Sequence, residues 1–481
     1  MIGAPKPYPA YKDSGAEWLG DIPADWNVLP GRACYRERHV PNLGLVETSV
    51  LSLSFGRIVV KPEEKLHGLV PSSFETYQII DPGDIIVRPT DLQNDWNSLR
   101  FGLSTHRGII TSAYMCLRTT DVMTREFGHL LLHAYDLKKV FYGLGSGLRQ
   151  NLDWRDFKYL PCVVPPLDEQ AAIVRHVNHV NRRVRQFIRD KQKQIRLLEE
   201  QKQATINRAV TCGLDPGVRH KPSGVESLGD VPEHWDVRRL KDVAVVQTGL
   251  TLGKDYRGAT TESYPYLRVA NVQLGHADLT HVKYVDVPPG EAAGATLRAG
   301  DVLMTEGGDI DKLGRGCVWK GEIPNCLYQN HVFAVRCNLD VLAPEFLVGL
   351  MTSQHGRAFF QTTAKQTTNL ASTNSTTLRT FPVALPPIGE QRAILDELAR
   401  RTSRIDAVVA RTENEARLLH EYRTCLTAGV AMGKTHVREA ADSLLADDDE
   451  LEFVDGEDVC TGRAEADDIG EVEVDLDAVE A

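Results

Sequence analysis

The chain has 481 residues, enough for two or three domains that each bury a core. Its formal net charge of −11 does not exclude a nucleic-acid partner, because residues 442–481 carry seventeen Asp and Glu residues and one Arg, a net charge of −16 that leaves +5 on residues 1–441. The nine cysteines form no CxxC pair and no run of eighteen apolar residues occurs, so we expect a cytoplasmic protein without a zinc ribbon, a disulfide framework or a membrane span.

The chain contains an internal repeat. The N-terminal segment, residues 1–25, holds the start of SGAEWLGDIPADWNV (14–28), which matches SGVESLGDVPEHWDV (223–237) at nine of fifteen positions. PGDIIV (82–87) and AGDVLM (299–304), then PPLDEQAAIV (165–174) and PPIGEQRAIL (386–395), follow in the same order. The offset between partners grows from 209 to 221 residues, so the second copy is about twelve residues longer. We expect the shared blocks to form the scaffold and the divergent segments to carry specificity.

Each copy begins with a β-rich part, predicted over residues 26–165 and 235–385. Short β-branched runs such as DIIVRP and HVFAVRC alternate with Gly, Pro and Asn turns, which predicts a compact α/β domain. Each part includes one helical stretch, REFGHLLLHAYDLKKVFYG in the first copy and PEFLVGLMTSQHGRAFFQ in the second. Pro344 suits the first turn of the latter helix.

Two long amphipathic helices follow, predicted over residues 166–214 and 386–437, with a linker at 215–234 that holds the second repeat start. Their apolar residues recur at steps of three and four, the pattern of a coiled-coil seam. We expect an antiparallel pair because neither helix can bury its stripe alone; docking on another subunit is the alternative. The first predicted seam passes through Ile173, Val177, Val180, Val184 and Phe187, then slips to Ile188, Ile195, Leu198 and Ile206. The second passes through Ile394, Leu398, Ile405, Val408, Leu419, Tyr422 and Leu426, with interruptions at Arg401, Thr412 and Glu415.

Patterns that look catalytic fail on spacing or context. GVAMGKT (429–435) and GLTLGKD (249–255) have three residues between their glycines, one fewer than a phosphate-binding loop needs. GLGSG (143–147) lacks the spacing of a dinucleotide site, and HLLLH (129–133) lacks the glutamate of a zinc protease. We therefore expect no catalytic site, no bound cofactor and no metal. The alternative, a free-standing enzyme, would rest on GVAMGKT.

Polar and basic clusters in the divergent segments suit nucleic acid. Arg and Lys match phosphates and guanine edges, and Asn and Gln match adenine. A solvated turn is the alternative for any single residue, and the parallel placement in two copies favours binding. In the first copy the candidates are Asn97, Arg100, His106 and Arg107, on a loop between two strands, and Arg149, Gln150 and Asn151 in GSGLRQN. In the second they are Arg268 and Asn271 in YPYLRVANVQL, Lys312 and Arg315 in EGGDIDKLGRG, and Gln329, Asn330 and His331 in LYQNH.

The ordered set of blocks resembles the specificity subunits of type I restriction-modification enzymes. The resemblance covers residues 14–437 and rests on SGxExLGDVPxHW, PYLRVANVQ, GDVLMTEGGDIDKLGRGCVW, CLYQNHVFAVR, LRQNLDWRDFKYLPCVVPPLDEQ and LPPIGEQRAI. It implies an α+β protein without catalytic activity, with two α/β target-recognition domains in tandem repeat. Two long helices would separate the domains and form an antiparallel coiled coil with pseudo-two-fold symmetry. Each domain would read one half of a bipartite site in double-stranded DNA.

The resemblance also implies partners. Two modification (methyltransferase) subunits would dock on the helices and use S-adenosylmethionine, and restriction (helicase-nuclease) subunits would use ATP and Mg. Two features depart from the family pattern: an acidic tail at 438–481, and TNLASTNSTTLRTFPVALPP where the first copy has QNLDWRDFKYLPCVVPP. Composition predicts a disordered tail, which either solubilises the chain or has a DNA-mimicking or partner-binding role. A free-standing coiled-coil protein without a restriction role, either DNA-binding or an assembly scaffold, is the alternative function.

Overall fold

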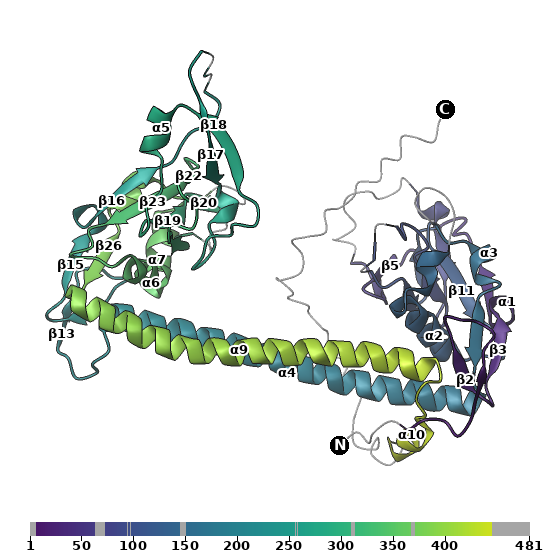
Figure 1. The fold of residues 1–481 in the computed structure, drawn as a ribbon. Coiled ribbons are helices and arrows are strands. Elements are labelled where there is room, and N and C mark those ends of the chain that lie inside the picture. The colour runs from purple at the N-terminus through teal and green to yellow at the C-terminus, as the bar shows by residue number, and fades with distance from the viewer. Residues whose placement is uncertain are drawn as a thin grey trace. The chain divides into compact units, whose positions relative to one another are not determined.

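A computed structural model describes residues 6–62, 73–93, 95–96, 98–144, 151–254, 256, 258–308, 313–366 and 371–444. The acidic tail beyond residue 444 lies outside these residues, as do Asn97, Arg149, Gln150 and Lys312. By its internal contacts the chain divides into two compact units. Unit 1 runs to Val184 and resumes at His420, and unit 2 runs from Arg185 to Leu419. Each contains a β-rich part and segments of two long helices (Figure 1).

A four-stranded antiparallel sheet of the same topology forms the core of each unit. In unit 1 its order is β4 (Tyr35–Arg38), β11 (Met115–Thr119), β8 (Ile85–Val87) and β9 (Phe101–Leu103). In unit 2 its order is β16 (Ala244–Thr248), β23 (Val332–Cys337), β19 (Val302–Thr305) and β21 (Gly316–Val318). β9 divides the segment that was predicted to be a single loop around Arg100 and Arg107. The repeat in the sequence is therefore a repeat in topology.

Helices cover the sheets at equivalent places. In unit 1, α2 (Arg125–Leu137) buries Phe127 and Leu131 in the core cluster that also holds Ile85 and Leu117 of the sheet. In unit 2 the single predicted helix is two helices, α6 (Pro344–Thr352) and α7 (Gln354–Thr363). The break falls at Ser353, whose hydroxyl accepts a hydrogen bond from Gly356 N and caps α7. Pro344 begins α6, as its fixed φ favours.

Small paired strands complete each unit. In unit 1, β1 (Tyr11–Asp13) pairs with β2 (Asp21–Pro23), and β3 (Asn27–Pro30) pairs with β12 (Pro161–Val164). In unit 2, β13 (His220–Pro222) pairs with β14 (Asp230–Pro232), and β15 (Asp236–Arg239) pairs with β26 (Pro382–Leu385). The divergent strands of unit 1 are β5 (Leu51–Ser54), β6 (Arg57–Val60), β7 (Gln78–Ile80) and β10 (Gly108–Ile110). Those of unit 2 are β17 (Glu262–Leu267), β18 (Lys283–Val287), β20 (Gly307–Gly308), β22 (Leu327–Tyr328), β24 (Lys365–Gln366) and β25 (Ala371–Ser372), with α5 (Pro289–Gly294). The two short helices α3 (Trp154–Phe157) and α8 (Ser375–Arg379) follow capping residues at equivalent positions, Asp153 and Asn374.

The shared GD block is a turn that anchors a buried carboxylate. Gly83 and Gly300 have φ of +93° and +90°, a conformation that favours glycine. The next residue in each copy is a buried aspartate. Asp84 accepts hydrogen bonds from Arg118 Nε at 2.8 Å and Arg38 Nη1 at 2.8 Å, and Asp301 accepts them from Arg336 Nε and Nη2 at 2.8 and 2.7 Å. The block is therefore scaffold, because its polar groups are used within the domain.

The shared EQ block joins each domain to its long helix, α4 (Leu167–Cys212) or α9 (Ile388–Ala431). Gln170 is fully buried; its Oε1 accepts from Thr124 N at 2.8 Å, and its Nε2 donates to Val122 O and Pro165 O. Gln391 makes the same three bonds in unit 2, to Ala343 N, Val341 O and Pro386 O. One amide thus ties the start of each long helix to the loop before α2 or α6.

The two long helices lie side by side within each unit (Figure 1). In unit 2, Lys191 pairs with Glu415 at 2.7 Å and Lys202 with Asp406 at 2.6 Å, so α4 and α9 run in opposite directions there. In unit 1, Val177 of α4 and Val430 of α9 belong to one core cluster.

The buried positions of the two helices differ from the prediction at a few residues. Of the predicted seam residues, Val177, Val184, Ile394 and Leu398 are buried and Leu198 and Ile405 are half-buried. Phe187 is 48% exposed and the neighbouring Ile188 is 6% exposed, so the buried stripe passes from Val184 to Ile188, which agrees with the predicted slip, and Phe187 does not belong to it. Val408 and Tyr422 are exposed, whereas Thr412, predicted as an interruption, is 3% exposed. Apolarity alone misassigned these positions because polar side chains, including Lys191 and Thr412, take part in the contact.

The end of each long helix packs on the tryptophan of a repeat start. Gly213 and Gly433 both have φ of +74°, and a Cβ on Gly433 would come within 2.5 Å of Pro23 and 3.0 Å of Trp26. After α9 the chain returns to the N-terminal segment, where Lys434 Nζ donates to Leu19 O and Asp21 O. GVAMGKT therefore ends a helix, and its lysine is bound to backbone carbonyls. The next helix, α10 (Arg438–Leu444), is the last element described.

We predict that Ile188→Glu destabilises the protein and Phe187→Glu does not. A buried, unpaired carboxylate at position 188 should cost roughly 3 kcal/mol or more, whereas position 187 leaves the charge in water. Denaturant unfolding of the two variants measures the difference. Equal destabilisation by both would contradict the register of α4.

We predict a loss of stability in mild acid that depends on His133. Burial, followed by the positive charges of His129 and Arg423, lowers the pKa of His133 from 6.5 to about 4. The folded state therefore holds this imidazole neutral, so its stabilising contribution is full above pH 6.5 and is lost as the pH falls from 6.5 towards 4. The loss should be at most about 3 kcal/mol. Unfolding free energies of wild type and His133→Gln, measured between pH 7 and 4.5, should differ in slope, and parallel curves would refute the assignment.

Candidate nucleic-acid interface

In unit 2, most of the predicted residues meet at one end of the four-stranded sheet. Strand pairing sets Met304 opposite Gly316 and Thr305 opposite Val332, so the loops that follow β19 and precede β21 and β23 lie together. These loops carry Glu306, Arg315 and His331. We call this set, with Gln329 and Asn330, the unit 2 edge.

The unit 2 edge is held by contacts that leave polar groups accessible. His331 Nδ1 lies 2.6 Å from Glu306 Oε2, and the imidazole side chain is 56% exposed. Gln329 Oε1 accepts from Val269 N at 3.4 Å, which ties the edge to the turn after Arg268. Gln329, Asn330 and Arg315 are half-buried. Arg268 is also half-buried, and its Nε has no hydrogen-bond partner among the described residues. The edge thus offers amides, a guanidinium and an imidazole on a fixed backbone.

Asn271 does not belong to this surface, which corrects its assignment as a DNA-binding residue. Its side chain is 3% exposed. Its Oδ1 accepts from Arg268 N at 2.8 Å, and its Nδ2 donates to Asp278 O at 2.8 Å and His281 O at 3.3 Å. Asn271 therefore shapes the loop between β17 and β18.

In unit 1 the predicted residues fall at opposite ends of the sheet. Val87 lies opposite Phe101, so Arg100 lies at the end equivalent to the unit 2 edge. His106 and Arg107 follow β9 at the other end, where Arg107 pairs with Asp81 at 2.7 Å and Glu47 at 3.4 Å. The parallel placement expected from the sequence is therefore wrong for His106 and Arg107, because β9 runs between the two groups.

Arg100 is a structural residue, although it occupies the position of Arg315. It is fully buried. Its guanidinium donates to Thr90 O and Asp95 O at 2.7 Å each, to Asp91 O at 3.2 Å and to Arg88 O at 3.3 Å. These bonds fix the shape of the loop after β8. Because Arg100 Nε also donates to Tyr142 Oη at 3.3 Å, no donor of the guanidinium remains for DNA. The same charged side chain therefore supports a loop in unit 1 and is partly accessible in unit 2.

Trp96 is the residue at this end that the sequence analysis missed. Its side chain is 54% exposed, its Nε1 donates to Gln93 O at 3.1 Å, and its ring lies 4.6 Å from that of Tyr142. Lys139 Nζ donates to Trp96 O and lies 4.5 Å from the centre of the Tyr142 ring. A large aromatic ring beside cations can stack on a base or insert into a groove. A tryptophan in a polar loop was the available signal, but its exposure follows only from the fold.

Asn151 completes the unit 1 edge, which we define as Arg88, Trp96, Lys139 and Asn151. Asn151 is exposed and its Oδ1 accepts from Asp91 N at 3.2 Å, so a backbone donor fixes the orientation of its amide. Leu152 N donates to Pro89 O at 2.9 Å, just as Thr373 N donates to Glu306 O at 2.9 Å in unit 2. The segment before the last strand of each domain differs in sequence between the two copies, but it makes the same backbone hydrogen bond at both edges.

Two expected absences can be examined only in the described part of the chain. There, no group of three or more His, Cys, Asp and Glu side chains is placed to hold a metal ion. His129 and His133 stack with ring centres 6.2 Å apart, and burial lowers the pKa of both. No helix within the same residues is long and apolar enough to cross a bilayer.

The chain is similar in sequence to a family profile and to several proteins, all of which are described as type I restriction specificity domains or subunits. The family profile described as type I restriction modification DNA specificity domain matches residues 232–415. A Methanocaldococcus jannaschii protein, provisionally described as the specificity subunit of type I restriction enzyme MjaX, is 27% identical over 198 residues, 40% of this chain and 44% of the relative. The specificity subunit of type I restriction enzyme MjaVIII from the same organism is 23% identical over 368 residues, 74% of this chain and 81% of the relative. The chain thus spans less than half of the first relative and four fifths of the second.

One solved structure shares the fold. It comes from work on complex assembly and conformational transition of the type I R-M system, and it has a TM-score of 0.62 and 17% sequence identity, over 85% of this chain and 98% of that chain.

We predict that Arg100→Met destabilises unit 1 while Arg107→Met does not. The first change leaves four backbone carbonyls without a donor and should cost about 3 kcal/mol or more. The second removes surface ion pairs of a side chain that is 54% exposed and should cost less than about 1 kcal/mol. Unfolding of the full chain measures both. A stable Arg100→Met protein that had lost DNA binding would restore Arg100 as a contact residue.

Proposed function

Because this chain belongs to the specificity subunits of type I restriction-modification systems, we propose that it is the DNA-reading component of such a complex. The observation that carries the proposal is the pair of equivalent sheet edges. The blocks common to both copies use their polar groups inside the domains, as Asp84 and Asp301 do, whereas the edges present different side chains on the same backbone framework. A constant framework with variable polar edges is what two recognition domains for different sequences require.

Each domain is proposed to read one half of a bipartite site in double-stranded DNA. In the unit 2 edge, Arg315 suits guanine and Gln329 or Asn330 suits adenine. In the unit 1 edge, Asn151 suits adenine and Trp96 supplies an apolar contact. Both edges lie on loops fixed by buried side chains, so their donors and acceptors hold their positions before DNA arrives.

The two long helices are proposed to form an antiparallel coiled coil that sets the spacing and relates the domains by pseudo-two-fold symmetry. Half-sites read from one side of a duplex would lie about 34 to 36 Å apart. Several large apolar side chains of these helices are exposed, including Phe187, Leu197 and Val408. Exposed apolar residues on a paired helix favour docking of another subunit, and we assign that place to two modification subunits.

The chemistry is proposed to reside in the partner subunits. Methyl transfer from S-adenosylmethionine belongs to the modification subunits, and ATP- and Mg-dependent cleavage belongs to the restriction subunits. The lysine of GVAMGKT supports this division, since its Nζ is bound to Leu19 O and Asp21 O. ATP turnover by the isolated chain would contradict it.

We predict that substitutions at the two edges relax different half-sites. Asn330→Ala removes a bidentate contact to one base of the half-site read by unit 2. The discrimination against other bases at that position should fall by about 1 to 3 kcal/mol. Trp96→Ala should affect only the other half-site. Mapping of methylated adenines in DNA modified by each assembled complex measures both effects.

Arg107→Ala serves as the control, because Arg107 lies at the opposite end of the unit 1 sheet from Trp96 and should leave the methylated sequence unchanged. Equal relaxation of both half-sites by either edge variant would show a joint reading surface instead of two modules.

A further inference from the structure

One face of α4 in unit 2 carries an excess of positive charge. The unit 2 part of α4, residues 185–212, contains seven Lys and Arg residues and three acidic residues, and residues 185–196 hold five of the basic residues and one of the acidic ones. The unit 2 part of α9, residues 388–419, has six basic and six acidic residues. Three of the six arginines in this part of α9 also form ion pairs along their own helix: Arg400 and Arg401 with Glu397, and Arg411 with Glu415. The charge is therefore unbalanced on one of two neighbouring helices.

The basic residues of α4 fall on one stripe. Lys191 is engaged with Glu415 of α9. The other four, at steps of four, four and three residues, share a different face of the helix. We call Arg185, Arg189, Lys193 and Arg196 the basic stripe. Lys193 and Arg196 are exposed, and neither makes an ion pair among the described residues.

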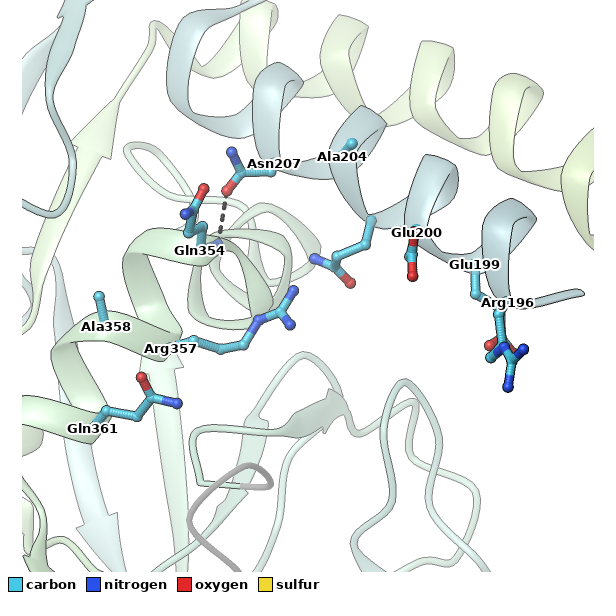
Figure 2. A pocket seen from close by; sticks show the side chains of 10 residues that line it. Arg196, Glu199, Glu200, Ala204, Asn207, Gln354, Arg357, Ala358 and Gln361 are labelled. Atoms are coloured by element: carbon cyan, nitrogen blue, oxygen red, sulfur yellow. Dashed lines mark hydrogen bonds between the residues drawn. The ribbon is translucent and has the colours of Figure 1, made fainter. Parts of the chain in front are cut away.

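The basic stripe lies on the face of α4 that carries the unit 2 recognition domain. Seven and eleven residues beyond Arg196, Gln203 Nε2 donates to Thr352 O at 3.0 Å and Asn207 Oδ1 accepts from Gln354 N at 2.7 Å. An open groove of about 810 Å³ lies beside these bonds, between α4 and α7. Figure 2 shows the side chains that line it and the bond between Asn207 and Gln354. Arg196, Glu199 and Glu200 line it from α4, and Arg357 extends into it from α7, so the basic stripe ends at Arg196. The stripe continues this face along the helix, away from the domain.

We propose that the basic stripe binds the phosphates of the duplex segment between the two half-sites. This inference rests on the proposed function and adds a sequence-independent contact to it. From Arg185 to Arg196 the stripe is about 16 Å long, enough for charges to follow several successive phosphates. Exposed Lys and Arg side chains on long stems suit phosphates, which need charge and carry no sequence information. The contact would hold the unspecified base pairs against the helix while the two edges read the specified ones.

The test uses the specificity chain assembled with its modification subunit and a duplex that carries its mapped methylation site. Lys193→Gln combined with Arg196→Gln should weaken binding on the order of 10-fold near 0.15 M salt and reduce the slope of log affinity against log salt by about 2. The methylated sequence should not change. Methylphosphonate linkages in the spacer should weaken wild-type binding and cause no further loss in the double variant.

Arg400→Gln combined with Arg404→Gln removes the same charge from α9 and is the matched control, expected to retain wild-type affinity and slope. An unchanged salt slope in the Lys193 and Arg196 double variant would overturn the inference while leaving site-specific methylation, and so the proposed function, in place. Loss of co-purifying modification subunit from that variant would identify the stripe as a protein-docking surface and would also overturn it. A wild-type complex without any preference for its site would instead refute the proposed function and, with it, the premise of this inference.

Discussion

A buried glutamine at the start of each long helix holds the architecture of both units together. The side chains of Gln170 and Gln391 each accept a hydrogen bond from one backbone N–H and donate to two backbone carbonyls. These backbone groups lie on both sides of the joint between domain and helix. A buried amide that lost these partners would leave several polar groups unsatisfied at once, so the joint has little freedom. The direction in which each recognition edge faces its own helix is therefore set by the fold of that unit. Such a joint would suit the proposed role of the helices in setting the spacing between half-sites.

The two edges show how one framework supports different surfaces. Arg100 and Arg315 occupy equivalent positions at the start of β9 and β21, yet Arg100 is fully buried among backbone carbonyls and Arg315 is half-buried. The difference comes from the loop after the preceding strand. In unit 1 that loop curls around the guanidinium and presents Trp96, and in unit 2 the chain after Thr305 continues as the short strand β20, paired with β25. Specificity can therefore change through loop shape while the buried Asp84 and Asp301 turns remain the same.

The long helices combine a polar contact with an uneven distribution of charge. Ion pairs from Lys191 and Lys202 to α9 supplement the apolar contacts and fix which residues face each other. Such pairs add little stability at a surface, but they discriminate between registers. The basic stripe of α4 is proposed to contact DNA, and the exposed apolar residues Phe187 and Leu197 are proposed to contact another subunit. DNA and protein subunits would then use different faces of one helix.

The sequence by itself determined the repeat, the two long helices and the absence of a recognisable catalytic motif, because each of these depends on local pattern. Gly83, Gly300, Gln170 and Gln391 were identifiable as scaffold since they recur in order, and the helices extend close to their predicted limits. Exposure and partners could not be read in this way. The strand β9 separated Arg107 from Arg100, burial removed Arg100 and Asn271 from the candidate surface, and exposure added Trp96. Ile188 and not Phe187 lies on the buried face of α4, and the polar residue Lys191 shares the contact with α9. These outcomes depend on which distant segments meet, and only the tertiary structure decides that.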